Sequence, residues 1–351
     1  MRSLIEVPAG LADVAVAATT VGDVVGDEGW YHYRGTSAVE LARRASFEEA
    51  AALVLDESGA PALGERGLPP AVAELVGRLD LRSGLSALGA AIGARPLVDI
   101  DPAQRRADAV RLISALPTLV ASIHHRRPAE PRPELGHAAN YLWMTTGAEP
   151  KAELVRALET YLVLTIDHGF NASTFTARVI ASCGADLGAC VVGAFGALSG
   201  PRHGALQTRV LDMLDAIGEP ERAEGWLRAQ IAGGGRLLGF GHAVYRAPDP
   251  RAALLREVLA AVAPERARLV EQVERAGLEL LAGRRLVTNV DLYAAPLLEA
   301  CGLPRPLLAA TFAVSRVVGW CAHALEQAAE PKIIRPAAYY VGRPPTPPST
   351  G

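Results

Sequence analysis

The sequence predicts a mainly helical protein, on two observations. Four long segments repeat apolar residues with the 3.6-residue period of an α-helix, whereas few segments alternate with the two-residue period of a strand. The best candidate for a short hairpin is GWYHYRG at 29–35. The four helical segments are 151–169, 249–262, 265–283 and 305–328.

The ends of these segments follow the chemistry of helix termini. The first segment is expected to stop at Gly169, because glycine is a common terminator. The second begins with Asp249 in a capping position and Pro250 in the first turn. Residues 126–136, rich in proline and arginine, are expected to form an exposed loop, and the proline-rich tail from Arg343 is expected to fray.

The composition excludes several classes of protein. The chain has 351 residues, 50% hydrophobic and 21% charged, enough for one large or two ordinary domains. Thirty-five basic and 38 acidic residues give a net charge of −3, which argues against nucleic acid or a membrane as the main partner. The N-terminus does not resemble a signal peptide, and apolar residues 189–198 are too few to span a bilayer, so we expect a cytoplasmic protein.

The cysteines indicate neither a disulfide framework nor a zinc site. No two of them are spaced as CxxC, and no histidines stand near them at ligand spacing. The four are Cys183, Cys190, Cys301 and Cys321.

Two segments interrupt the helical pattern around a histidine. In DHGFNAST at 167–174, His168 ends an apolar helix; taken alone, the segment favours a helix C-cap followed by a new N-cap. In SGPRHGALQ at 199–207, the Gly-Pro step is expected to open a helix with His203 in its first turn. The free N–H groups there disfavour imidazolium and predict a neutral histidine, although a surface histidine is the better interpretation of this segment in isolation.

Two further segments combine flexible backbone with charged side chains. The glycine-rich stretch 233–251 does not match GxGxxG after a strand, but it carries His242 and Arg251, which a simple turn less often does. In NVDLY at 289–293, Asp291 is equally well interpreted as a helix cap or as a functional carboxylate.

Arg316 is the most informative single residue. It lies in a segment where nearly every other residue is apolar, and no acidic residue lies three or four positions away. Because burial of an unpaired charge is costly, its partner must be a distant carboxylate or a bound anion.

Together these segments resemble the citrate synthase family. The motifs GPRHG and GFGHAVYRAPDPR, in this order, are specific, and the resemblance extends from residues 10–35 through NVD and FAVSRVVGW to IIRPAAYYVG at 333–342. It implies an all-α, two-domain homodimer with the active site in the cleft, and neither a metal nor a permanently bound cofactor. The implied large domain is 1–203 and 297–351, and the implied small, mobile domain is 204–296.

The resemblance implies condensation of acetyl-CoA with oxaloacetate and hydrolysis of the citryl thioester to citrate and CoA. It implies that Asp291 is the enolising base, that His203 stabilises the enol and that His242 protonates the oxaloacetate carbonyl. The implied carboxylate ligands are His168, Arg251, Arg316 and, from the other subunit, Arg335. The implied CoA contacts are Arg236, Leu237, Leu238, Gly239, Phe240, Gly241 and Arg246.

Elementary chemistry fits these roles. Forming an enolate from a thioester methyl group needs a base on one side and a hydrogen-bond donor at the oxygen, and a neutral histidine suits the donor role. A dicarboxylate calls for several arginines, which would account for Arg316. Sheltering the enolate from water requires closure of the cleft between the domains.

The chain also departs from the family's usual motifs, which leaves alternatives open. It has HGALQ, with Leu206 and Gln207, where HGGAN is usual, and VTNVDLYAA where YPNVDFYSG is usual. It also ends soon after the last motif. Reduced bulk at Leu292 and Ala294 could admit propionyl-CoA, which would make the protein a 2-methylcitrate synthase. A third hypothesis is a paralogue that binds CoA or dicarboxylates with little turnover.

Overall fold

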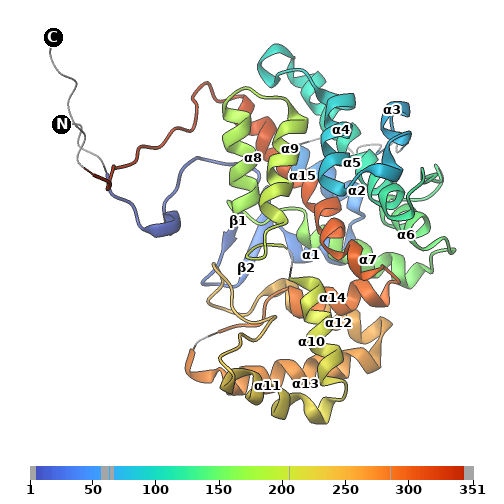
Figure 1. The fold of residues 1–351 in the computed structure, drawn as a ribbon, viewed down its shortest axis with the longest axis vertical. Coiled ribbons are helices and arrows are strands. Elements are labelled where there is room, and N and C mark those ends of the chain that lie inside the picture. The colour runs from blue at the N-terminus through green and yellow to red at the C-terminus, as the bar shows by residue number, and fades with distance from the viewer. Residues whose placement is uncertain (1–4, 57–62, 64–66, 205, 285, 344–351) are drawn as a thin grey trace.

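The computed structural model describes residues 5–56, 63, 67–204, 206–284 and 286–343, and these residues are mainly helical (Figure 1). The helices up to the middle of the chain are α1 (Ala38–Arg44), α2 (Phe47–Leu55), α3 (Pro70–Ala73), α4 (Leu81–Gly93), α5 (Pro102–His125), α6 (His137–Thr146), α7 (Ala152–Thr165) and α8 (Ala172–Ser182). The later helices are α9 (Leu187–Leu198), α10 (Gln207–Ile217), α11 (Ala223–Ala232), α12 (Pro250–Val262), α13 (Pro264–Leu280), α14 (Asp291–Ala300) and α15 (Leu308–Ala328). The strands are β1 (Gly22–Val25), β2 (Trp30–Tyr33) and β3 (Thr36–Ser37).

All four predicted helical segments are confirmed, as α7, α12, α13 and α15. The predicted end of α7 is wrong, because the helix ends at Thr165, before Gly169. The Asp167 carboxylate accepts a hydrogen bond from the Gly169 N–H at 3.0 Å, and such a local turn competes with helix continuation. Gly169 adopts a φ of +59°, so this glycine serves the turn that follows the helix.

The other local predictions agree with the structure where it describes them. Asp249 caps α12, because its side chain accepts a hydrogen bond from the backbone N–H of Arg251. Residues 126–136 form a largely exposed connection between α5 and α6. The tail that was expected to fray lies, apart from Arg343, outside the described residues.

The predicted hairpin is part of a three-stranded antiparallel sheet in the order β1-β2-β3. Strand β2 lies within 29–35, but its longer partner β1 precedes that segment and pairs Gly22 with Tyr33. The hydroxyls of Tyr31 and Tyr33 donate to the carbonyls of Leu164 and Val163 at 2.8 and 2.9 Å. The sheet therefore fixes the end of α7, from which the site segment 167–174 continues.

Helix α15 lies at the centre of the upper part of the molecule in Figure 1, packed against α2, α5, α7, α8 and α9. Together with the turn before it, α15 is the one helix among the described residues that is long and apolar enough to cross a membrane. Inside the protein 94% of its apolar stretch is buried, as expected of a helix that forms the core.

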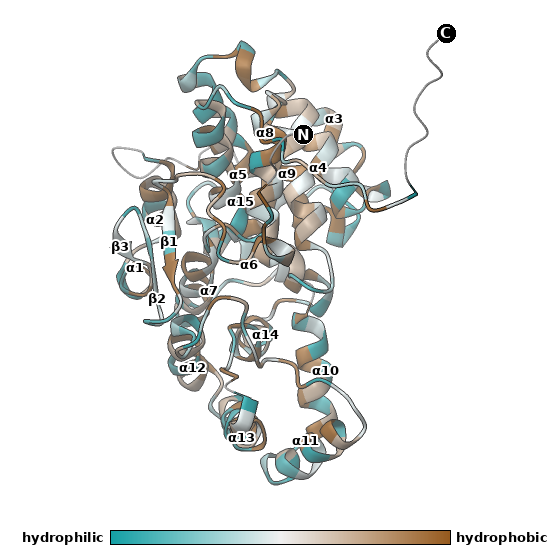
Figure 2. Cartoon of the chain, turned by 90° about the vertical axis from the view of Figure 1, so that its left-hand side faces the viewer, coloured by the Kyte–Doolittle hydropathy of each residue, from teal (hydrophilic) through white to brown (hydrophobic). Residues whose placement is uncertain are grey.

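Helices α10 to α14 form the lower part of the molecule (Figures 1 and 2). Helix α13 packs on α11 and α12, α14 packs on α10 and α12, and both α12 and α14 also contact α7 of the upper part. Helix α14 continues to Ala300, beyond the predicted boundary at 296–297. The division into a large and a small, mobile domain stays a prediction.

Candidate active site

Six of the predicted site residues lie near one another where the upper helices meet the lower ones. The charge of Arg251 acts on His168, His242 and Asp291, and the charge of Arg316 acts on His168 and His203. The ring centroids of His168 and His242 are 5.4 Å apart. Segments separated by more than a hundred residues in sequence therefore supply one cluster of basic and acidic groups.

Arg251, in the first turn of α12, is held by a buried carboxylate. Its Nε and Nη2 donate to the two oxygens of Asp249 at 3.0 and 2.8 Å, and both side chains are almost completely buried. Asp249 also accepts from the backbone N–H of Val290 at 3.1 Å. This carboxylate thus joins α12 to the residue before Asp291 and fixes the orientation of the guanidinium.

Arg316, in the middle of α15, has the opposite environment. It is 1% exposed, and its Nε donates to the Thr165 carbonyl at 2.7 Å. Among the described residues it forms no ion pair, and its buried Nη2 has no hydrogen-bond partner. Asp167 is the distant carboxylate that partly compensates its charge. The remaining N–H donors are suited to a second, bound anion.

His242 presents a hydrogen-bond donor beside Arg251. Its Nδ1 accepts from the backbone N–H groups of Val244 and Tyr245 at 3.0 and 2.9 Å. Burial and the charge of Arg251 lower the pKa of His242 to about 4, so the neutral ring carries its proton on Nε2. Nε2 lies 3.2 Å from Arg251 Nη2, and two adjacent donors favour an acceptor oxygen bound between them.

His168 lies beside this pair and is also neutral, because burial and both arginine charges lower its pKa well below the usual range. Its Nε2 lies 3.0 Å from the hydroxyl of Tyr245. The Tyr245 hydroxyl therefore fixes the orientation of the ring.

The predicted helix around His203 is wrong. Helix α9 ends at Leu198 and α10 begins at Gln207, and His203 lies in a turn between them in which its N–H donates to the Gly200 carbonyl. The N–H of Gly204 folds back onto the Leu198 carbonyl at 2.9 Å, which closes the turn before α10 can start. The ring is nevertheless neutral, because burial, followed by the charge of Arg316, lowers the pKa of His203 to about 4.

Ser173 orients the ring of His203. The Ser173 hydroxyl accepts from Trp320 Nε1 at 3.1 Å, donates to Asn171 Oδ1 at 2.7 Å and lies 2.9 Å from His203 Nε2. Asn171 Oδ1 also accepts from the N–H groups of Ser173 and Thr174. When the Ser173 proton turns from Asn171 to His203 Nε2, the proton of the neutral ring lies on Nδ1, where it can serve as a donor.

Asp291 is not a helix cap, so that interpretation is wrong. It is the first residue of α14, its N-cap position is Val290, and no side chain caps the helix. Burial raises the pKa of Asp291 to about 6, although the Arg251 charge opposes this shift. A half-buried carboxylate with this pKa is ionised at neutral pH and is suited to accept a proton.

The loop predicted to line CoA is anchored to the chain that leads to Asp291. Gly239 and Gly241, with φ of +84° and +88°, exchange backbone hydrogen bonds with 287–289. Phe240 packs on α13, where a Cβ at Gly277 would lie 2.2 Å from its ring. Leu237 is buried and Leu238 half-buried, whereas Arg236 and Arg246 are exposed.

Arg335 is not brought to the site of its own chain. It is exposed on the extended segment after α15, coloured red in Figure 1, which leads away from the helices. The side chains of Leu292 and Ala294 are completely buried, with Leu292 against Gly239 of the loop predicted to line CoA, and extra room for an acyl group beside Asp291 stays a prediction.

Several residues that shape the site were missed. Asp249 was recognised only as a cap, although an acid two positions before a buried arginine could have signalled the ion pair. Tyr245 and Ser173 orient histidines across the fold and have no signal in the sequence.

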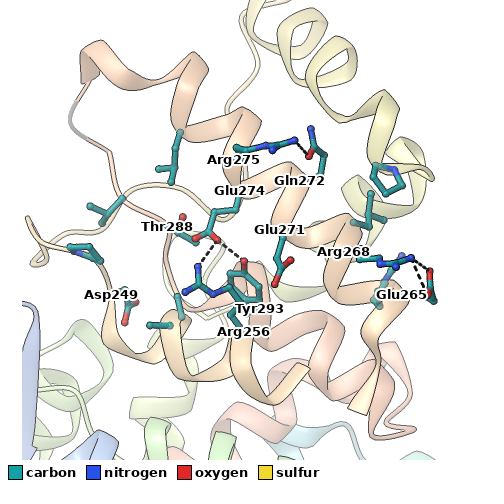
Figure 3. A pocket seen from close by; sticks show the side chains of 18 of the residues that line it. Asp249, Arg256, Glu265, Arg268, Glu271, Gln272, Glu274, Arg275, Thr288 and Tyr293 are labelled. Carbon is teal, nitrogen blue, oxygen red and sulfur yellow. Dashed lines mark hydrogen bonds and ion pairs between the residues drawn. The ribbon is translucent and has the colours of Figure 1, made fainter. Parts of the chain in front are cut away.

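A large hollow lies elsewhere, on the lower helices. It is a groove of about 1670 Å³ along α12 and α13 (Figure 3). Its charges are largely paired with one another, as in the contacts of Glu274 with Arg256 and Tyr293 and of Arg268 with Glu265. Of the charged side chains and histidines of the cluster described above, only Asp249 lines it. In the described part of the chain no cluster of three or more metal-ligating side chains occurs.

Fold and site thus define an all-α protein with a buried anion site beside an acid–base group. A sequence model of the family described as "Citrate synthase, C-terminal domain" matches residues 10–337. The chain belongs to the citrate synthase family, transferases that condense an acyl-CoA with oxaloacetate.

Relatives within this family carry two different names. The chain is 32% identical to a citrate synthase of Deinococcus radiodurans, with 95% of each chain covered. It is 34% identical to a 2-methylcitrate synthase of Mycobacterium tuberculosis, with 96% of this chain and 91% of the relative covered. Identity at this level favours neither name for this chain.

Solved structures of the family share the fold. The citrate synthase of Pyrobaculum aerophilum is 32% identical, with a TM-score of 0.86 and coverage of 97% of this chain and 95% of that one. The citrate synthase of Thermoplasma acidophilum, in a ternary complex with carboxymethyl coenzyme A and oxaloacetate, is 26% identical, with a TM-score of 0.85 and coverage of 95% and 96%.

Proposed function

We propose that this chain condenses acetyl-CoA with oxaloacetate and hydrolyses the citryl thioester to citrate and CoA. The observation that carries the proposal is the combination of a carboxylate of raised pKa, Asp291, with three neutral histidines around two buried arginines. The complex of the Thermoplasma relative with oxaloacetate and a CoA analogue supports the same pair of substrates.

Oxaloacetate is the ligand proposed for the arginine side of the site. Arg316 offers the donor left free at Nη2, and Arg251 offers a guanidinium oriented by Asp249. His168 would complete the carboxylate contacts. The keto oxygen would lie between His242 Nε2 and Arg251 Nη2, where two donors already face one another.

The reaction then follows from the proton positions. Asp291 takes a proton from the acetyl methyl group, and the electron pair of that C–H bond forms the enol carbon–carbon bond while His203 Nδ1–H donates to the thioester oxygen. The enol carbon attacks the keto carbon of oxaloacetate, the enol oxygen becomes the thioester carbonyl again, and the keto oxygen takes the proton of His242 Nε2. The proton that Asp291 removed from the methyl group replaces the one that His242 lost, so both groups return to their starting states. Water then cleaves the thioester to release citrate and CoA.

CoA is proposed to bind along the loop 236–241, with the exposed side chains of Arg236 and Arg246 as partners for its phosphates. CoA would be a co-substrate that leaves with each turnover, and no permanently bound cofactor or metal is required.

We also propose a homodimer in which Arg335 enters the neighbouring site. The chain ends carry large apolar side chains that the described chain does not cover: Ile5 is 89%, Tyr340 74% and Val341 90% exposed. A second copy would bury them and would bring Arg335 to an oxaloacetate carboxylate. A cytoplasmic location stays a prediction, to be tested by cell fractionation.

The 2-methylcitrate synthase hypothesis is supported by the relative of that name. Thiol release by purified protein with oxaloacetate and either acetyl-CoA or propionyl-CoA separates citrate synthase from 2-methylcitrate synthase activity. Since one extra methylene changes selectivity by only ~10- to 200-fold, kcat/KM is compared for both substrates. We expect the higher kcat/KM with acetyl-CoA. No release with either substrate, from folded protein that still binds oxaloacetate, would favour a paralogue without turnover.

A further inference from the structure

The turn between β1 and β2, residues 26–29, is docked on loop 244–248, which leads into α12. The carbonyl oxygen of Gly26 accepts a hydrogen bond from the backbone N–H of Arg246 at 3.1 Å. A Cβ at Gly26 would lie only 2.5 Å from the carbonyl oxygen of Val244. The turn therefore approaches the loop this closely because position 26 has no side chain.

The second glycine of the turn contacts the same loop. A Cβ at Gly29 would lie 3.0 Å from the Cβ of Ala247 and 3.1 Å from the carbonyl oxygen of Pro248. Gly29 has a φ of +70°, and its N–H donates to the Val25 carbonyl at 3.0 Å, which closes the turn. The sequence GDEG at 26–29 is thus suited to a turn that packs against another segment of backbone.

The docked loop also holds the ring of His242. The N–H groups of Val244 and Tyr245 donate to His242 Nδ1 at 3.0 and 2.9 Å. The next N–H along the chain, that of Arg246, donates to Gly26. Three consecutive backbone N–H groups are therefore divided between the ring and the turn. Displacement of the loop at Gly26 would move both donors of the ring, and with them the direction of Nε2–H.

The sheet that carries the turn is fixed to the upper helices. The hydroxyls of Tyr31 and Tyr33 bond the end of α7, and the ring centroid of Tyr31 lies 5.3 Å from that of His168. Strand β1 also packs on the turn that follows His168, where a Cβ at Gly169 would lie 3.3 Å from the Val24 side chain. One sheet therefore contacts the segments of both histidines, across the predicted boundary between the domains.

We propose that Gly26 and Gly29 are positioning residues for His242: the turn that they form holds loop 244–248 so that the ring presents Nε2–H to the keto oxygen of the substrate. This inference rests on the proposed function, in which His242 protonates that oxygen. The two glycines act through the loop and not on the substrate.

Gly26→Ala tests the contact with a single methyl group. The φ of Gly26 lies outside the left-handed region, so alanine introduces an overlap with the loop but no strained backbone. With both substrates saturating, kcat should fall by roughly 10- to 100-fold, because misplacing a reacting group by about 1 Å can cost this much. The Kd of a non-reactive acyl-CoA analogue should change much less, because loop 236–241 is held by residues 287–289.

The protonation of the His242 ring gives a readout that a general loss of stability would not move. In NMR spectra of ¹⁵N-labelled protein at neutral pH, the wild-type ring should show an unprotonated Nδ1 and a protonated Nε2. The variant His242→Gln identifies the signals of this ring. Gly26→Ala should shift these signals or mix the two neutral tautomers, because Nδ1 loses the alignment of its two N–H donors.

Gly29→Ala and Gly35→Ala form a matched pair that keeps the test decisive if Gly26→Ala does not fold. Both glycines have a positive φ, +70° and +82°, so alanine strains the backbone at either position. A Cβ at Gly35, however, meets no described atom within 4 Å. Gly29→Ala should lower kcat and shift the His242 signals, whereas Gly35→Ala should leave both unchanged.

Arg43→Gln is a control for the general connection between the upper and lower helices. Arg43 of α1 forms an exposed ion pair with Glu257 of α12 at 2.8 Å, a second link from the N-terminal segment to the lower helices. Exposed pairs contribute little to stability, and this one lies outside loop 244–248. Arg43→Gln should therefore leave kcat and the His242 signals unchanged.

The inference is overturned if the His242 signals stay unchanged in Gly26→Ala or, where that variant does not fold, in Gly29→Ala. A loss of kcat in Gly35→Ala or Arg43→Gln as large as in the turn variants would make the effect one of general strain and would also overturn it. Absence of turnover in the wild type contradicts the proposed function instead, and the His242 signals then still decide whether the turn positions the ring.

Discussion

The two buried arginines of the site show how differently two regions of one molecule accommodate a positive charge. Arg251, in the lower helices, is paired through two hydrogen bonds with Asp249. Arg316, in the upper helices, bonds a backbone carbonyl and keeps an unpartnered N–H group. The first arginine is compensated before any ligand arrives, whereas the charge of the second is compensated only partly, by the distant carboxylate of Asp167. The contrast implies that a bound anion compensates the charge of Arg316 in particular. The folding of the region around Arg251 depends instead on the ion pair with Asp249.

Asp291→Asn is expected to have the largest effect on activity. It should abolish the chemical step while both arginines still bind oxaloacetate. Loss of the general base is expected to lower kcat by ~10²–10⁴-fold. The oxaloacetate Kd should hardly change, because the arginines bind that substrate. A variant that has lost thiol release but binds oxaloacetate as tightly as the wild type in calorimetry would agree with these separate roles of Asp291 and the arginines. A variant with more than a tenth of wild-type activity would contradict the role of Asp291.

Replacing each arginine by methionine tests the contrast directly. Arg251→Met leaves the buried Asp249 carboxylate without its cation, which should lower the free energy of unfolding by about 3–5 kcal/mol. Arg316→Met leaves mainly the Thr165 carbonyl unpaired, which should cost only about 1–3 kcal/mol. Denaturant unfolding without ligand measures both. Oxaloacetate should raise the Tm of the wild type but of neither variant; equal destabilisation by the two substitutions would remove the contrast.

The sequence could predict the residue types of the site but only part of their partners. The isolation of Arg316 among apolar residues signalled its missing partner, because local neighbours within one helix are visible in sequence. The neutral state of His203 was also predicted, but for the wrong reason: burial and Arg316 cause it, and no helix start is involved. Contacts such as Ser173 with His203 join residues 30 positions apart through helix packing, which no local pattern reveals.

Asp291→Asn should also change stability, in the opposite sense to activity. The folded protein raises the pKa of Asp291 from 3.8 to about 6, so it binds this proton more tightly than the unfolded chain does. The stability from this group is therefore present below pH 4 and lost as the pH rises through about 6. The Asn variant should melt higher than the wild type at pH 7.5, and the difference should shrink at pH 5. A lower Tm of the Asn variant than of the wild type at pH 7.5 would show that burial of the ionised Asp291 does not destabilise the protein.

Arg335→Ala tests whether the arginine side of the site is complete within one chain. The variant should bind oxaloacetate poorly, although Arg335 lies far from its own site. Mixing it with Asp291→Asn should restore some activity after subunit exchange, because one site of the heterodimer then receives both wild-type residues. Fluorescence energy transfer between labelled subunits confirms that exchange occurs. Exchange without any gain over the parent proteins would mean that Arg335 does not cross between subunits.

The smallest expected effect is the coupling between the two arginines through closure. Arg251 lies on α12 of the lower helices and Arg316 on α15 of the upper ones, so one dicarboxylate held by both would draw the two parts together. Closure should then complete the acyl-CoA site next to loop 236–241. The coupling free energy is expected to be ~1–3 kcal/mol and must be the same in either order of binding. Calorimetric titration of a non-reactive acyl-CoA analogue, with and without oxaloacetate, measures this coupling.

Two variants serve as controls. Arg251→Ala should weaken oxaloacetate binding and also abolish the increase in analogue affinity that oxaloacetate causes. Arg236→Ala should weaken binding of the analogue and leave oxaloacetate binding intact. Equal analogue affinity in both titrations of the wild type would mean that the two arginines bind the same anion without moving the helices that carry them.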